Sequence, residues 1–161
     1  MPRPKRAPRS SPRRRRALVV VARYNEVVTR RLLEGAIARL ATEGYAGGDV
    51  DVIWVPGAFE LPVAVHRGLG TRRYGVAVAL GAVLRGETPH FEYIASEATR
   101  GLGEAAIRFG IPVGFGLLTC DTLEQALARA GGEAGNKGAE AAAAAIETAR
   151  VLEEMGRASA E

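Results

Sequence analysis

The apolar positions of this chain follow two different periods. Short apolar runs bounded by Gly, Pro or Asn occupy residues 17–23, 50–55, 75–84 and 112–118. Such runs are typical of strands that are buried on both faces of a parallel sheet. Between the first two runs, apolar residues recur at helical spacing from Leu32 to Leu40, and Gly44 is well placed to end that helix. Spacing and alanine content predict further helices over residues 59–69, 91–109, 122–130 and 138–155.

The alternation of strands and helices indicates the fold class. Four strands joined by helical crossovers predict an α/β protein with a central four-stranded parallel sheet and helices on both faces. This is a flavodoxin-like three-layer α/β/α sandwich. A length of 161 residues suits one domain, which we place at residues 17–157, with residues 158–161 as the C-terminal end. The alanine-rich segment 139–149 permits close approach of another helix, for which self-association is one use.

Charge changes the picture only at the N-terminus. The first sixteen residues contain eight basic side chains and no acidic one, so 14 basic and 18 acidic residues remain in the body, a charge of −4. The net charge of the whole chain, +4, is therefore positive only because of residues 1–16. A segment rich in Pro, Ser and Arg cannot bury apolar surface, and we expect a disordered, solvated tail. Contact with RNA or an acidic surface is the alternative.

Cysteine and hydropathy exclude several classes. Cys120 is the only cysteine, so an internal disulfide is excluded, and no Cys and His cluster suits a structural metal. Its expected role is that of a small buried residue. No apolar run approaches the roughly 20 residues that cross a bilayer, and the basic N-terminus leads only into a short apolar stretch. We expect a cytoplasmic protein.

Candidate chemistry gathers where the predicted strands end. Parallel α/β sheets bind ligands beyond the carboxyl ends of their strands. The strands here lead into Tyr24 and Asn25, then into residues 56–62, 86–90 and 119–122. An aromatic ring, a carboxylate, a Gly-containing turn with a histidine and the start of a capped helix would then share one edge of the sheet.

The turn after the third strand carries the most chemistry. Thr88 is expected as the N-cap and Pro89 as the first residue of the following helix. Gly86 allows close approach of a ligand, and the helix N-terminus favours an anion such as phosphate. The positive helix end also favours a neutral imidazole at His90, suited to proton exchange near pH 7, whereas a bound phosphate would oppose this. A packed or capping histidine is the alternative for His90.

Several separate motifs, read together, resemble one family. They are Ala22-Arg23-Tyr24-Asn25-Glu26, Val55-Pro56-Gly57-Ala58-Phe59-Glu60-Leu61-Pro62, residues 81–93, Leu118-Thr119 and Gly135-Asn136-Lys137-Gly138. In order and spacing this pattern resembles lumazine synthase, over nearly everything except the tail. The resemblance implies condensation of 5-amino-6-(D-ribitylamino)uracil with 3,4-dihydroxy-2-butanone 4-phosphate to 6,7-dimethyl-8-ribityllumazine, the penultimate step of riboflavin biosynthesis. It implies no cofactor and no metal.

The resemblance also implies roles for individual residues. The ribitylaminouracil would be bound by a set that combines a stacking aromatic, the ribityl turn and the pyrimidine-reading strand end, namely Tyr24, Ala58, Phe59, Glu60, Ala82, Val83, Leu84 and Phe115. Tyr24 stands where the family usually has Phe. The butanone phosphate would be bound by Gly86, Glu87, Thr88 and Arg129, and His90 would transfer protons. Without the resemblance, Tyr24 could simply close its strand, Glu60 could cap a helix, and Arg129 could be solvated.

Geometry and resemblance together predict an oligomer. Arg129 lies about 10 Å down a helix that leads away from the strand ends, and Phe115 precedes its strand end, so a neighbouring subunit's site is the easier destination. The family builds its sites between subunits of a pentamer and forms pentamers or shells of twelve pentamers. The short segment 131–138 favours the sixty-subunit shell, with isolated or paired pentamers as the alternative. Association with riboflavin synthase is a further implied partnership. Lys137 also matches the family's site, with an ion pair to Glu140 as the alternative.

Two other function classes compete with the enzyme. One is a shell or scaffold protein that packages RNA or acidic cargo through its Arg-rich tail, with a decayed site. Retention of Tyr24, Glu60, His90 and Arg129 argues against decay. The other is a flavin- or nucleotide-binding module, but the chain contains neither a dinucleotide Gly fingerprint nor a P-loop.

Overall fold

The computed structural model describes residues 15–160, so most of the predicted basic tail lies outside the described residues. Four strands form one sheet in the order β2-β1-β3-β4, with every neighbouring pair parallel. Their bounds are β1 (Arg16–Ala22), β2 (Val50–Val55), β3 (Tyr74–Leu84) and β4 (Val113–Cys120). The predicted four-stranded parallel sheet is confirmed. The first strand begins at Arg16, which we had placed in the tail, and the fourth continues two residues further than predicted, to Cys120.

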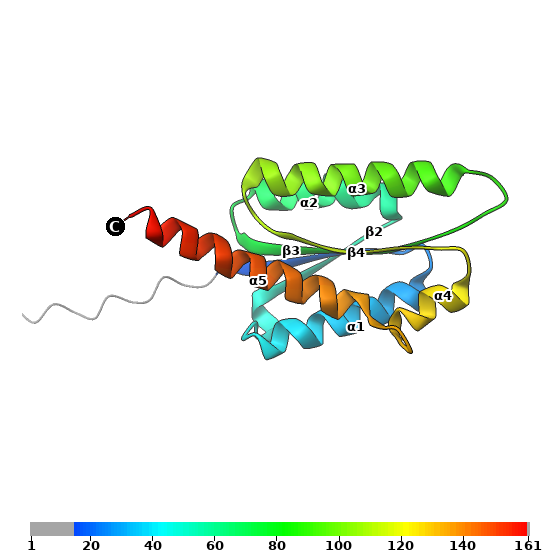
Figure 1. Ribbon diagram of the computed structural model, residues 1–161, viewed down its shortest axis with the longest axis horizontal. Coiled ribbons are helices and arrows are strands. Elements are labelled where there is room, and N and C mark those ends of the chain that lie inside the picture. Colours follow the sequence, from blue (N-terminus) through cyan, green and yellow to red (C-terminus); the bar gives the residue numbers. More distant parts are fainter. Residues whose placement is uncertain (1–14, 161) are drawn as a thin grey trace, which may run out of the picture.

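Helices cover both faces of this sheet, as predicted. Figure 1 shows α2 (Leu61–Gly70) and α3 (His90–Phe109) on one face. On the other face lie α1 (Glu26–Thr42), α4 (Leu123–Ala128) and α5 (Lys137–Ala158). Two short 3-10 helices, η1 (Gly47–Asp49) and η2 (Ala58–Glu60), precede and follow β2. Within residues 15–160, no helix is long and apolar enough to cross a membrane.

A small hairpin between α4 and α5 was not predicted. It pairs β5 (Ala130–Gly132) with β6 (Gly135–Asn136) in antiparallel fashion. Strands of three and two residues are too short to show the alternation that marks a strand in a sequence. The chain can turn here because Gly131 and Gly135 adopt positive φ angles, +98° and +78°, which glycine tolerates without steric cost.

Burial of both faces of β1 explains why residues 17–22 are all apolar. Ala17, Val19 and Val21 belong to the core under α1 and α5, whereas the alternate residues Leu18, Val20 and Ala22 belong to the core under α2 and α3. None of the six is more than 2% exposed. A strand buried on both faces has no polar side, so its sequence cannot alternate.

The last helix is fixed to the body at its N-terminal end. The Asn136 side chain accepts hydrogen bonds from the N–H groups of Gly138 and Ala139 and donates one to the carbonyl oxygen of Arg31 in α1. A Cβ atom at Gly138 would overlap the carbonyl oxygen of Leu32. The alanines that follow in α5 allow the same close packing within the chain. The buried ones (Ala141, Ala142 and Ala145) lie in the core under α1.

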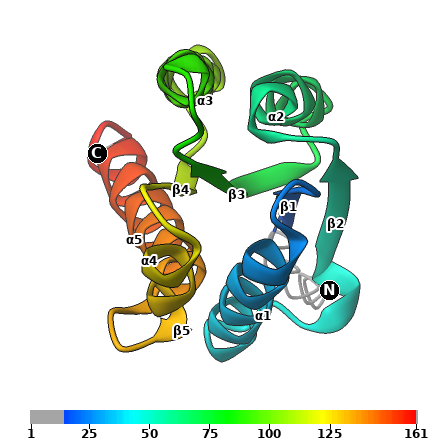
Figure 2. The ribbon, with the colours of Figure 1, turned by 90° about the vertical axis from the view of Figure 1, so that its right-hand side faces the viewer.

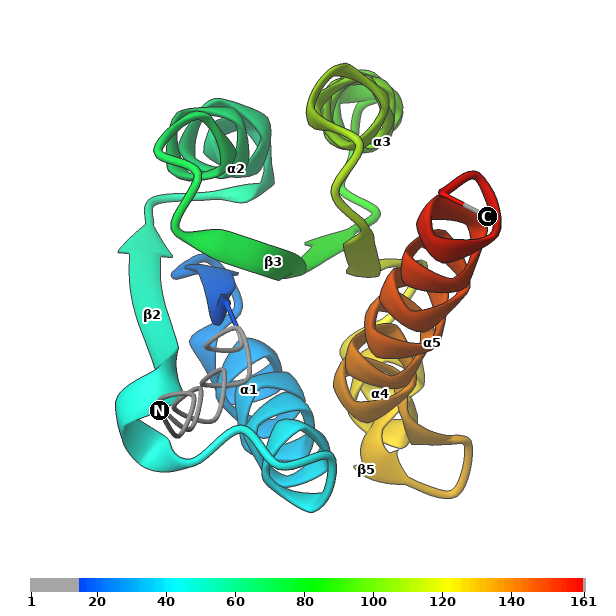
Figure 3. The same cartoon turned by 90° about the vertical axis from the view of Figure 1, so that its left-hand side faces the viewer.

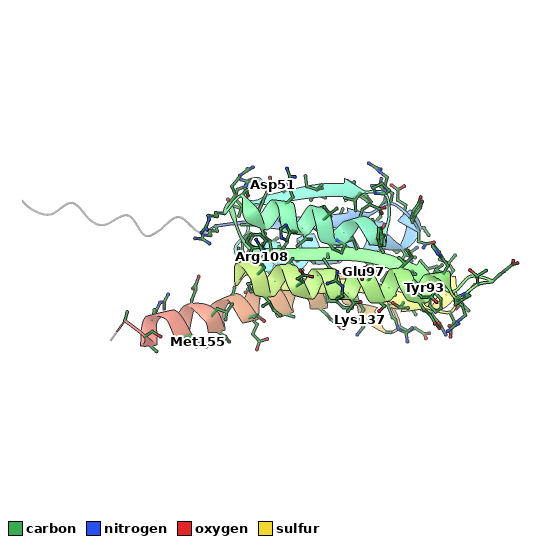
Figure 4. The ribbon with its side chains drawn as sticks, turned by 90° about the horizontal axis from the view of Figure 1, so that it is seen from above. Asp51, Tyr93, Glu97, Arg108, Lys137 and Met155 are labelled. Carbon is green, nitrogen blue, oxygen red and sulfur yellow. The ribbon has the colours of Figure 1, made fainter. Side chains whose placement is uncertain are left out.

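The two ends of the sheet differ in character. Figure 2 views the end where the chain passes from β1 into α1 and from β3 into α3. Figure 3 views the opposite end, where α5 finishes. The second end carries Asp51, which is labelled in Figure 4 and pairs with Arg16 and Arg73. Figure 4 places Tyr93, from the first turn of α3, at the first end, far from Asp51.

Candidate active site

A pocket of about 380 Å³ opens beyond the carboxyl ends of β1 and β3. Its walls come from the β1 exit, the η2 turn, the last residues of β3 and the first turn of α3. The residues that line it are Tyr24, Asn25, Gly57, Ala58, Phe59, Glu60, Ala82, Val83, Leu84, His90, Phe91 and Ile94. The sequence motifs therefore converge in one place, at the sheet edge where α/β folds bind ligands.

Tyr24 forms an open aromatic wall of this pocket. Tyr24 is 69% exposed, although it lies only two residues beyond the buried end of β1 at Ala22. The ring lies against Gly57, where a Cβ atom would come within 2.5 Å of the Tyr24 Cδ2 atom. Glycine at 57 therefore makes room for the ring. Because one face of the ring is open to the pocket, it can accept a planar heterocycle by stacking.

Asn25 is a pocket residue whose role we did not predict. It adopts the left-handed conformation, with φ 62° and ψ 46°. Its side-chain Nδ2 donates a 2.7 Å hydrogen bond to the carbonyl oxygen of Ala82. Asn tolerates this backbone conformation better than most residues. An Asn between a buried strand and a helix is a weak sequence signal for a left-handed turn residue. Nothing in the sequence indicates that its hydrogen-bond partner is Ala82, 57 residues away.

Glu60 is held by its own turn. One carboxylate oxygen, Oε2, accepts a 3.0 Å hydrogen bond from the N–H of Gly57. The capping role that we had kept as an alternative is therefore present, but it occupies one oxygen of a residue that also lines the pocket. Its neighbour Phe59 is 56% exposed and lines the same wall. This hydrogen bond restricts the orientation of the carboxylate at the pocket wall.

The last residues of β3 form one wall of the pocket. Ala82 is 4% exposed, and its carbonyl oxygen is already taken by Asn25. Val83 and Leu84 follow on the same wall and remain in register with Thr119 and Cys120 of β4. A strand end held on both sides is a rigid edge for reading a flat ligand through hydrogen bonds.

The turn into α3 differs from our prediction by one residue. The N-cap is Pro89, with φ −70° and ψ 6°, and it provides no side-chain cap, so the expected N-cap role of Thr88 is wrong. The ψ angle of Pro89 lies outside the helical range, which delays the helix until His90. Gly86, Glu87 and Thr88 are exposed in the turn itself. His90 is thus the first residue of the helix and lines the pocket.

Six predicted site residues do not line this pocket, and three of them are Gly86, Glu87 and Thr88 of the exposed turn before α3. The other three lie elsewhere on the chain. Phe115 is half exposed on β4, which forms a free edge of the sheet. The Arg129 side chain folds back along α4 and donates to the carbonyl oxygen of Gln125 at 3.0 Å. Lys137 forms the ion pair with Glu140 that we had kept as its alternative, at 2.7 Å.

Two further residues with reactive side chains, Cys120 and His66, do not line the pocket. Cys120 is buried, as predicted, and burial raises the pKa of its thiol, which makes it a poor nucleophile. His66 lies on the surface of α2, where its ring packs edge-on against Phe109 at 4.9 Å. Among residues 15–160, no group of three or more His, Cys, Asp or Glu side chains could hold a metal ion.

The comparisons with known proteins all identify the same family. The family model described as 6,7-dimethyl-8-ribityllumazine synthase matches residues 14–153. A protein of that name from Anaeromyxobacter dehalogenans (strain 2CP-C) is 56% identical over 145 residues, covering 90% of each chain. One from Gemmatimonas aurantiaca is 60% identical and covers 83% of this chain and 81% of its own. One from Nitratidesulfovibrio vulgaris is 48% identical, with 85% and 88% covered.

Proposed function

The chain belongs to the 6,7-dimethyl-8-ribityllumazine synthase family of transferases, and from this membership we propose how its pocket performs the family's reaction. The reaction condenses 5-amino-6-(D-ribitylamino)uracil with 3,4-dihydroxy-2-butanone 4-phosphate. It releases phosphate and water and yields 6,7-dimethyl-8-ribityllumazine in riboflavin biosynthesis. The observation that carries the proposal is the convergence of Tyr24, Glu60 and His90 on one pocket.

The ribitylaminouracil occupies the pocket between β1 and β3. Its pyrimidine ring stacks on Tyr24, whose open face and position against Gly57 support this role. The strand end at residues 82–84 reads the edge of the ring through backbone groups. The ribityl chain runs along Ala58 and Phe59, and Glu60 accepts hydrogen bonds from its hydroxyls with the oxygen that Gly57 does not occupy.

The butanone phosphate binds beside the first turn of α3. The exposed turn formed by Gly86, Glu87 and Thr88 offers backbone N–H groups, and the positive end of a 20-residue helix adds to the attraction for phosphate. A Cβ atom at Gly86 would meet no atom within 4 Å, so the space next to this backbone is open to a ligand. His90 is the first helical residue after the turn and lines the adjacent pocket, in which we place the uracil.

His90 is the proton-transfer residue. The amine of the uracil attacks the ketone, and loss of water as the imine forms requires protons to be moved between nitrogen and oxygen. Elimination of phosphate and closure of the second ring require further proton transfers. An imidazole at the pocket wall, between the phosphate turn and the heterocycle, is placed to serve these steps. The assigned residues act without metal or cofactor.

A neighbouring subunit completes the site. Phe115 and Arg129 do not line the pocket of their own chain, and Phe115 lies on a free sheet edge. Large apolar side chains are exposed near this end of the molecule, including Tyr24, Phe59, Val63 and Tyr93, as expected for a surface that another subunit covers. We infer a pentamer in which Phe115 borders the uracil of the adjacent site and Arg129 clamps its phosphate. The short segment 131–138 favours assembly of the pentamers into the sixty-subunit shell. We place this assembly in the cytoplasm and infer that it associates with riboflavin synthase.

Product formation tests the proposal. Purified protein treated with a chelator is expected to form the lumazine from the two substrates, followed by its absorbance and fluorescence. A variant with Tyr24→Ala should bind the uracil substrate more weakly, because the stacking wall is lost, and should remain folded since the ring is largely exposed. Absence of product at micromolar enzyme, with correct folding confirmed by circular dichroism, would contradict the assigned reaction.

A further inference from the structure

Arg85 connects three elements beside the phosphate turn. Its backbone N–H donates to the carbonyl oxygen of Cys120 at 2.9 Å, which extends the β3–β4 pairing beyond the end of β3. Its side-chain Nε donates to Oδ1 of Asp121 at 2.7 Å. The guanidinium carbon lies 4.4 Å from the centre of the Phe91 ring, and Nη1 lies 4.0 Å from Oε1 of Glu92. Arg85 thus joins the exit of β4 to the first turn of α3.

These contacts contribute little to stability. The side chains of Arg85, Glu92 and Asp121 are 52%, 63% and 60% exposed, and ion pairs between such exposed groups add little to the free energy of folding. A role in holding the fold together is therefore a weak explanation for this arrangement. A role in the electrostatics of the turn explains it better.

The turn needs a cation because its surroundings are acidic. Glu87 is part of the turn, and Glu92 and Asp121 flank it. Charges that are closer together than the screening length, about 8 Å at physiological ionic strength, act on one another, so carboxylates beside the turn repel a phosphate dianion that binds there. Unless they are neutralised, these carboxylates oppose the binding of the substrate. Arg85 contacts two of the three.

We propose that Arg85 is a positioning residue for the phosphate substrate, which neutralises Asp121 and Glu92 beside the turn and fixes the first turn of α3 through the ring of Phe91. The inference rests on the proposed phosphate turn at residues 86–88. Arg85 acts on the substrate through its neighbours. Asp121 is in turn held in place, since its N–H donates to Oε1 of Gln125 at 2.8 Å. Phe91 is 7% exposed and follows His90 directly, so its ring fixes the residue that moves protons.

A double-mutant experiment separates this role from direct contact. Arg85→Gln should raise the KM for the butanone phosphate about fivefold, the size of effect expected when an exposed charge pair is lost, with little change in the KM for the uracil. Adding Asp121→Asn to Arg85→Gln removes the nearer of the two carboxylates that Arg85 neutralises, at 2.7 Å against 4.0 Å for Glu92. The double variant should therefore recover a KM within about twofold of the parent, as coupled charges do.

Other outcomes overturn the proposal. If the double variant is as impaired as Arg85→Gln, Arg85 acts on phosphate directly and not through Asp121. If the melting temperature falls and both KM values rise together, Arg85 is merely structural. Arg100→Gln is the matched control, because Arg100 also pairs with two carboxylates on α3, those of Glu97 and Glu104, and should leave the phosphate KM unchanged.

The phosphate turn is tested separately with Gly86→Val. A Cβ atom at this position would meet no protein atom within 4 Å, so we expect the fold to tolerate the substitution, whereas a bound phosphate would be obstructed. An unchanged KM for the butanone phosphate in this variant would refute the phosphate turn itself. A raised KM in Gly86→Val, combined with no rescue in the double variant, would refute only the role of Arg85.

Discussion

The side-chain amide of Asn25 donates a 2.7 Å hydrogen bond to the carbonyl oxygen of Ala82. This bond joins the carboxyl end of β1 to that of β3, two adjacent strands whose ladder ends at the pair Val21 and Leu80. It therefore fixes the distance between the stacking wall at Tyr24 and the strand end proposed to read the pyrimidine. The relative position of these two walls of the pocket therefore depends on the Asn25 side-chain amide as well as on the pairing of the strands.

Substitution of Asn25 should affect stability and substrate binding together. Asn25→Gly keeps the left-handed backbone and removes the hydrogen bond, so the free energy of unfolding should fall by about 1 kcal/mol. Asn25→Ala also strains the backbone and should cost about 1–2 kcal/mol more. Both variants should raise the KM for the uracil substrate. Urea titrations at fixed protein concentration and steady-state kinetics measure the two effects; equal stability of Gly and Ala variants would contradict the role of backbone conformation.

His90→Ala should lower kcat about 10²- to 10⁴-fold, the usual contribution of a positioned acid or base. Uracil binding, measured by fluorescence titration, should change little, because the stacking and ribityl contacts remain. His66→Ala is the control, since His66 is the other histidine and lies on the surface of α2 away from the pocket. A kcat unaffected by His90→Ala would remove this residue from the mechanism.

Mixed assemblies test whether a neighbouring subunit supplies Arg129. Arg129→Ala alone should raise the KM for the butanone phosphate. If His90 and Arg129 meet from different subunits, co-assembly of the two single variants in equal amounts regenerates about one quarter of the sites with both residues intact. If both residues serve the same chain's site, no intact site can form. The comparison is between mixtures refolded together and mixtures of separately assembled variants, at a butanone phosphate concentration well below the raised KM, where the separately assembled mixture should show only the residual activity of the two single variants.

The fold could be predicted almost completely from local patterns, because buried parallel strands and alanine-rich helices have strong signals of their own. The start of α3 could not, since Thr88-Pro89 is also a normal helix start and only the ψ angle of Pro89 decides between the two. Interactions between distant residues were equally inaccessible. The bond from Asn25 to Ala82 and the pairing of Arg85 with Asp121 join residues more than 35 positions apart, and nothing in either local sequence specifies the other.

The N-terminal basic residues should be separable from catalysis. Residues 1–14 lie outside the described residues and contain six of the eight basic side chains, whereas Arg16 is part of β1. Deletion of residues 1–14 should therefore leave kcat and both KM values unchanged. If this segment contacts nucleic acid, the deletion should also remove an absorbance at 260 nm from purified protein, and raising the salt concentration should remove it from the parent. A ratio of absorbance at 260 and 280 nm that is equal in parent and deletion at low salt would exclude the contact.

Asp51 should make stability depend on pH in the acid range. Hydrogen bonds from Arg16 and Tyr74 hold the pKa of its carboxyl below its usual value, which is about 3.9 in an unfolded chain. The ionised form is thus favoured by folding, so its contribution is fully present above about pH 4 and is lost as the pH falls through the lowered pKa. Asp51→Asn should reduce the free energy of unfolding at neutral pH by only about 1 kcal/mol, because partial exposure weakens the ion pairs of Asp51. The difference from the parent should shrink on acidification.

The control is Asp49→Asn, two residues away, which should change the free energy of unfolding by less than about 0.5 kcal/mol. A parent-to-variant difference that stays constant from pH 7 to pH 3, measured by urea unfolding, would show that packing and not charge makes Asp51 stabilising.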